Sequence, residues 1–93
     1  MKKITGKTAT GFQFSIDAEA LDDMELLEEL GELTGGNMEA VPKVLTMFLG
    51  EKQKAKLYEH CRAKSGRVLA SKVVEELNSI FTVAGEENSD VKN

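Results

Sequence analysis

Residues 4–17 read ITGKTATGFQFSID, and this stretch predicts a β-hairpin. Apolar and polar side chains alternate from Phe12 to Ile16, so one face of that strand is apolar. A loop of residues 9–11, with Gly11 in the left-handed conformation, joins the two expected strands. The resulting register pairs three residues of each strand: Thr8 with Phe12, Gly6 with Phe14 and Ile4 with Ile16. A lone hairpin is marginally stable in water, so this one needs helices or a neighbouring chain against its apolar face.

Glycines divide the rest of the chain into four predicted helices. Asp17 and Asn37 are suitable N-caps for the first two, and the glycine pair at 35–36 ends the first. Gly50 separates the second helix from the third, and Gly85 ends the fourth. The expected helices cover about residues 18–33, 38–49, 51–64 and 69–84.

The fold class is therefore mainly α: an N-terminal two-stranded β-hairpin followed by a four-helix small domain. A chain of 93 residues suits one domain with a modest core. We expect residues 1–85 to form that domain, as a hairpin (1–17) and a helical part (18–85), and residues 86–93 to form a flexible polar tail. The sequence lacks the roughly 18 consecutive apolar residues of a membrane span and the apolar core of a signal peptide, which predicts a cytoplasmic protein.

Each expected helix has a different apolar pattern. The second is apolar nearly all round, which predicts the most buried element, and the third is mostly polar, which predicts a surface position. The first has an apolar stripe of Leu21, Met24, Leu27 and Leu30, with Leu26 and Leu33 partly off that line. The buried face predicted for the fourth is Val73, Leu77, Ile80, Phe81 and Ala84.

Charge changes sign along the chain. Residues 17–39 contain acidic side chains and no Lys or Arg, whereas residues 43–67 are mainly basic. The formal net charge is only −4, so the chain is close to neutral overall although its acidic and basic residues lie in different segments. It predicts an acidic part and a basic part that can attract each other or those of a neighbouring copy.

Patterns for catalysis or for bound ligands are weak. Gly6-Lys7-Thr8 lacks the earlier glycine of a phosphate-binding loop, because Met1 stands at that position. His60 and Cys61 are adjacent, but the chain has no other His or Cys to complete a zinc site. The acidic run lacks the alternating ligands and central glycine of a calcium loop. We therefore expect a protein that is not an enzyme and that needs no metal or cofactor.

The basic stretch leaves two alternatives. It could contact nucleic-acid phosphates, since two helices joined by a glycine-containing turn loosely suggest a helix-turn-helix. The pI of about 5.0 argues against nucleic-acid binding, and we favour head-to-tail association of copies into rings, spirals or filaments. Surface ion pairs contribute little, so apolar residues off the core stripes must supply most of the affinity. The candidate interaction residues are Leu26, Leu33, Met47 and Tyr58.

Short phrases spread along the chain carry a family resemblance: Thr10–Asp17, Glu19–Asp23, Leu49–Lys54, Leu57–His60, Gly66–Val68, Glu75–Leu77 and Ile80-Phe81. In this order they resemble the tail assembly chaperones of long-tailed (siphovirus-type) phages and prophages. The resemblance covers about residues 3 to 85 and consists of element order and short phrases, without a catalytic signature.

This resemblance implies a non-enzymatic, self-associating protein that coats the tape measure protein during tail assembly. It implies a location in the cytoplasm of the bacterial host and absence from the mature virion. Its partners are then the tape measure protein and further copies of itself, with the tail tube protein as a third candidate, and neither nucleic acid nor a membrane. The alternatives are a small prophage DNA-binding regulator and a structural tail component.

Overall fold

The N-terminal hairpin has the predicted register. The computed structural model describes the backbone of residues 2–92 and the side chains of residues 2–86. Strands β1 (Lys3–Lys7) and β2 (Gln13–Asp17) pair antiparallel, with Ile4 opposite Ile16 and Gly6 opposite Phe14. Gly11 has φ 96°, the left-handed conformation that the loop requires. The predicted apolar face is buried: Ile4, Phe12, Phe14 and Ile16.

The first predicted helix is divided into two elements at Asp23. Residues Ala18–Asp22 form a 3₁₀ helix, η1, and α1 covers Met24–Thr34. Asp17 caps η1, as predicted, and Asp23 caps α1 by accepting from the N–H groups of Glu25 and Leu26. Helix α1 ends just before the glycine pair, as predicted.

Helix α1 buries a different face from the one that the sequence predicted. Leu26 is only 2% exposed, and Leu30 and Leu33 pack against the core at the i, i+4, i+7 spacing of one helix face. Met24 is 67% exposed, and Leu27 is half exposed. The predicted stripe through Met24 and Leu27 is therefore wrong.

The second and third predicted helices are one element, so the described residues contain three α-helices where four were predicted. Helix α2 covers Ala40–His60. Gly50 has non-helical dihedrals (φ 82°, ψ 165°), so α2 consists of two helical segments that meet at a kink, at the residue where the sequence predicted a separation. Asn37 accepts from the Glu39 N–H in a turn before α2, and Glu39 takes the N-cap position, so the predicted N-cap is two residues early.

The observed burial of α2 matches the prediction in the first half of the helix and differs from it in the second half. The first half is largely buried, as predicted for the central element: Ala40, Val41, Val44, Leu45, Phe48 and Leu49. In the second half, predicted to lie on the surface, Leu57 is fully buried and so is the adjoining Cys61. That half therefore contributes to the core, because the hairpin packs over it.

Helix α3 covers Ala70–Lys92 and does not end at Gly85. Gly85 does not take a positive φ, which a glycine at a left-handed helix end requires, so it is an ordinary helical residue. The predicted buried face is confirmed for Val73, Leu77, Ile80 and Ala84, and Phe81 is partly buried. The predicted flexible tail, 86–93, falls mainly on residues whose side chains lie outside the described part of the chain.

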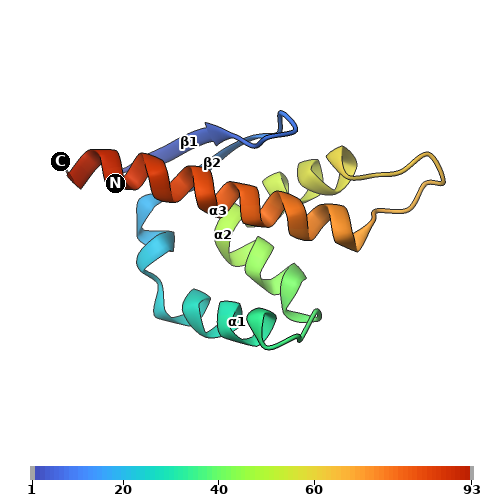
Figure 1. Cartoon of the computed structure of the whole chain (residues 1–93), viewed down its shortest axis with the longest axis horizontal. Coiled ribbons are helices and arrows are strands. Elements are labelled where there is room, and N and C mark those ends of the chain that lie inside the picture. Colours follow the sequence, from blue (N-terminus) through green and yellow to red (C-terminus); the bar gives the residue numbers. More distant parts are fainter. Residues whose placement is uncertain (1, 93) are drawn as a thin grey trace.

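The hairpin and α1 lie on opposite sides of α3 in Figure 1. Strand β1 packs on α3, β2 on α2, and α1 on α2. The rings of Phe48 and Phe81 stack with centroids 4.2 Å apart and join α2 to α3. The core is continuous from the hairpin to α1, and the turn between α2 and α3 is left at one end of the molecule.

Candidate functional site

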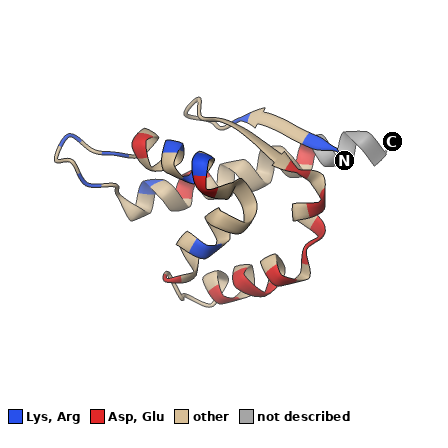
Figure 2. Cartoon of the chain, turned by 180° about the vertical axis from the view of Figure 1, so that it is seen from behind, with Lys and Arg blue, Asp and Glu red and all other residues tan. Residues whose placement is uncertain are grey.

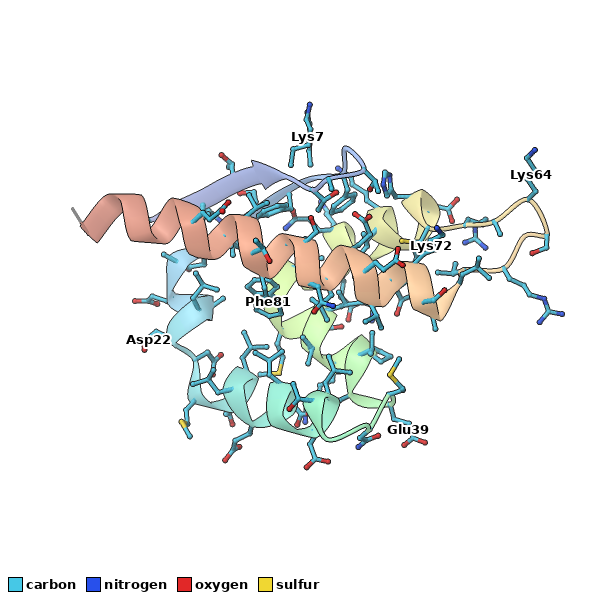
Figure 3. The ribbon with its side chains drawn as sticks, viewed as in Figure 1. Lys7, Asp22, Glu39, Lys64, Lys72 and Phe81 are labelled. Atoms are coloured by element: carbon cyan, nitrogen blue, oxygen red, sulfur yellow. The ribbon has the colours of Figure 1, made fainter. Side chains whose placement is uncertain are left out.

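The charges that alternate in blocks along the sequence are also separated in space. Figure 2 shows acidic residues along η1 and α1, and basic residues at the second half of α2 and at the turn that follows it. In Figure 3, Asp22 and Lys64 lie at opposite ends of the molecule. One ion pair joins α1 to α2, between Lys43 Nζ and Glu29 Oε2 at 3.1 Å. The surface therefore has an acidic part and a basic part, as the sequence predicted.

A groove of about 260 Å³ lies between the two ends of α2 and the start of α3. Every side chain that lines it is apolar apart from the Tyr58 hydroxyl: Met38, Val41, Pro42, Tyr58, Val68, Ala70 and Val73. Four other hollows of the described surface each include several polar or charged side chains. This apolar groove is the part of the surface best suited to take apolar side chains of a partner.

The rim of the apolar groove can adapt to a partner at Met38. Met38 is 50% exposed, and its flexible thioether can repack around different apolar groups. Tyr58 is partly buried, and Lys54 Nζ lies 6.0 Å from the centre of its ring and 3.5 Å from Glu51 Oε1. The positive charge beside the groove is therefore paired with a carboxylate of the same chain.

The four candidate interaction residues do not lie together. Tyr58 lines the apolar groove, whereas Met47 lines an acidic hollow with Asp22 and other residues of η1. Leu33 is partly buried against the core. Leu26 is buried in the core, so its prediction as a contact residue is wrong for the folded chain, because the register of α1 turns it inward.

The sequence did not predict the exposure of four large apolar side chains: Met24, Leu27, Met38 and Leu69. Asp23 followed by Glu25 is an N-cap signal, and a helix started there would have placed Met24 and Leu27 outside the core. No comparable local signal marks Met38 and Leu69, which lie in turns before α2 and α3.

A buried carboxylate ties the hairpin to α3. Glu76 is 5% exposed and accepts from Thr8 Oγ1 at 2.8 Å and from Thr10 Oγ1 at 2.6 Å. His60 Nε2 lies 2.8 Å from Thr10 Oγ1 and 4.0 Å from Glu76 Oε1. Because the single Thr10 hydroxyl hydrogen goes to Glu76, His60 Nε2 must donate to Thr10 and cannot act as its base. We interpret this cluster as a structural connection.

The Cys61 thiol lies at the end of α2, next to this cluster. Burial raises the pKa of Cys61, the nearby Glu76 charge raises it further, and Lys72 partly opposes them. The thiolate, which is the nucleophilic form, is therefore scarce at neutral pH. Cys61 is a small buried core residue.

Among the residues that the structure describes, no three His, Cys, Asp or Glu side chains gather closely enough to bind a metal ion. None of the helices, within the same residues, has the length and apolar character needed to cross a membrane.

Comparison with known proteins found no matching family model, no similar curated protein and no similar solved structure.

Proposed function

We propose that this chain is a phage tail assembly chaperone, which self-associates and coats the tape measure protein during tail assembly without an enzymatic step. The observation that carries the proposal is the apolar groove between α2 and the start of α3. A chaperone that holds a client needs an apolar surface that stays accessible in the folded protein. The sequence resemblance to tail assembly chaperones supplies the identity of the client.

The groove suits a helix better than an extended strand. It is lined by side chains from helices and turns, and strand edges that could pair with an added strand are not part of it. An amphipathic helix presents apolar side chains at i, i+3, i+4 and i+7, which can enter such a groove in succession. The tape measure protein is long and helical in the family that the sequence resembles, so it offers many such segments.

The surface charge suits the rest of the role. One groove holds only a short segment, so many copies along one client are needed for firm binding, and self-association supplies them. The acidic surface of η1 and α1 remains outside the groove and can keep a coated client in solution. In this role the protein acts in the cytoplasm of the bacterial host during assembly and is absent from the finished virion.

Co-expression with a tape measure protein tests the proposal. We expect the wild-type chain to raise the soluble fraction of the client, and Met38→Asp to remove most of that effect, because a charge at the rim opposes apolar binding. Thr82→Asp is the matched control, since Thr82 is exposed on α3, does not line the groove, and the charge change is the same. We expect it to behave like the wild type.

Other outcomes favour the alternatives. If the client stays insoluble with the wild-type chain, the chaperone role is wrong. A chain found in purified virions would instead be a structural tail component. A duplex-DNA mobility shift that salt abolishes, without any effect on the client, would indicate a DNA-binding regulator.

A further inference from the structure

We infer that copies of this chain associate head to tail, with the outer face of α1 in one copy against the turn between α2 and α3 in the next. We call the first surface the acidic face; it consists of Met24, Glu25, Leu27 and Glu28. The second is the basic end and consists of Arg62, Lys64, Arg67, Leu69 and Lys72. The inference rests on the self-association in the proposed function and names the two surfaces that make the contact.

The acidic face combines exposed apolar side chains with unpaired charge. Met24 and Leu27 are three residues apart, so they lie on one side of α1, and both are at least half exposed. Glu25 and Glu28 are exposed beside them and make no ion pair with any side chain that the structure describes. A surface with exposed apolar side chains among acidic residues is complementary to one with exposed apolar side chains among basic residues.

The basic end has that complementary composition. Leu69 is exposed and lines a hollow of about 300 Å³ together with Arg62 and Lys72. Lys64, Arg67 and Lys72 have no ion-pair partner within the described part of the chain. The hollow gives an apolar side chain of a neighbouring copy a place beside Leu69. Arg62 is paired with Glu59 of its own chain and Glu76 also lines the hollow, so Lys72 is the lining cation that a partner's carboxylate can reach.

Backbone hydrogen bonds hold the basic end in one shape. The Ala63 N–H donates to the Arg67 carbonyl at 2.8 Å, and the Gly66 N–H donates to the Ala63 carbonyl at 2.9 Å. Arg62 pairs with Val68 in an isolated β-bridge and donates from Nη1 to the Gly66 carbonyl at 2.7 Å. A turn ordered before binding loses less entropy when a partner docks.

The two surfaces of one molecule lie too far apart to neutralise each other. The molecule extends 45 Å along its longest axis, and the basic end and the acidic residues lie apart in Figure 2. Charges in solution are largely screened beyond about 8 Å at physiological salt. The acidic face and the basic end therefore interact little within one molecule, and each is free to pair with the opposite surface of another copy.

The symmetry of the contact follows from the use of two different surfaces. A contact between unlike surfaces leaves one free surface at each end of any short assembly, so it continues into a ring or an open filament. Ion pairs at the rim are weak, so we expect Met24, Leu27 and Leu69 to supply the affinity and the charges to select the orientation.

Two variants, each with one of the two surfaces disabled, test this arrangement in sedimentation velocity experiments. In the first variant, Met24→Ser is combined with Leu27→Ser; in the second, Arg67→Ser is combined with Leu69→Ser. All four residues are exposed, so both variants should keep the wild-type circular dichroism spectrum. Each variant alone should associate at least about tenfold more weakly than the wild type.

An equimolar mixture of the two variants gives the diagnostic result. It should form a one-to-one dimer that grows no further, because only one intact acidic face and one intact basic end remain to meet. Lys7→Ser, an exposed cation outside both surfaces, should associate like the wild type. A wild-type chain that stays monomeric, variants that associate normally, or a mixture that stays monomeric would each overturn the arrangement.

The test separates this inference from the proposed function. If the mixture fails to dimerise while Met38→Asp still abolishes client protection, the head-to-tail contact is wrong and the client groove stands. If instead the basic-end variant loses a salt-sensitive duplex-DNA shift that the wild type shows, the basic end is a nucleic-acid surface, and the inference is wrong for that reason.

Discussion

Thr8 donates its hydroxyl hydrogen to the buried carboxylate of Glu76 across 2.8 Å, although 68 positions separate the two residues in the chain. This bond fixes the tip of the hairpin on α3. The bond thus joins the N-terminal hairpin to α3, which is the last element of the chain. The bond connects the two strands, which would be marginal alone, to a helix that covers them.

Glu76→Ala should destabilise the protein by about 1–3 kcal/mol, because it leaves the buried Thr8 hydroxyl without its acceptor. Urea unfolding followed by circular dichroism measures this change. Glu75→Ala is the matched control, since Glu75 is exposed on the same helix, and it should change stability by less than about 0.5 kcal/mol. Equal midpoints for the two variants would contradict the structural role of Glu76.

Gly6→Ala should cost roughly 1–3 kcal/mol, because overpacking strains a filled core. A Cβ at position 6 would lie 2.7 Å from Val83 Cγ1 and 2.9 Å from Phe14 Cζ. Thermal unfolding should show the loss, and adding Val83→Ala should recover part of it. The control is Gly31→Ala within α1, where no atom lies within 4 Å of the new Cβ. That change should stabilise the protein by about 0.5–1 kcal/mol, and a loss there would show that the reasoning about space is wrong.

Stability should fall at alkaline pH because of Cys61. Its pKa is raised above the ordinary value of 9.0, chiefly by burial, so the folded state holds the thiol proton more tightly than the unfolded state. This contribution is fully present below pH 9.0 and is lost as the pH rises from there through the raised pKa. Above that pH, the free energy of unfolding should therefore fall as the pH rises, and Cys61→Ala should make this fall smaller. If the variant shows the same fall, the loss of stability comes from groups other than Cys61.

Local patterns predicted the hairpin in full. Alternation in residues 12–16 and a glycine at position 11 determine register and loop together, and both depend only on neighbouring residues. The buried face of α3 was equally predictable from its spacing.

The helix boundaries depended on choices that the sequence leaves open. Asp17 and Asp23 are both good N-caps, and the second one sets the register of α1, which decides whether Leu26 or Leu27 is buried. A glycine can end a helix, kink it or continue it. Gly50 kinks α2 and Gly85 continues α3, and tertiary contacts decide between these outcomes.

The apolar groove could be predicted only in part. Tyr58 was a candidate as an apolar residue off the core stripes, and it lines the groove. Met38, Val68 and Val73 come from three other places in the sequence and meet Tyr58 only when α2 and α3 pack. Such a site depends on tertiary structure, and no local pattern contains it.

Photocrosslinking from the rim of the groove tests the central claim most directly. A benzophenone amino acid is placed at position 38, or at position 82 as the control, in the chain co-expressed with a tape measure protein. Irradiation followed by mass spectrometry should give crosslinks to helical segments of the tape measure protein from position 38 and none from position 82. Equal crosslinking from both positions, or none from position 38 while the client is kept soluble, would contradict the assignment of the groove to the client.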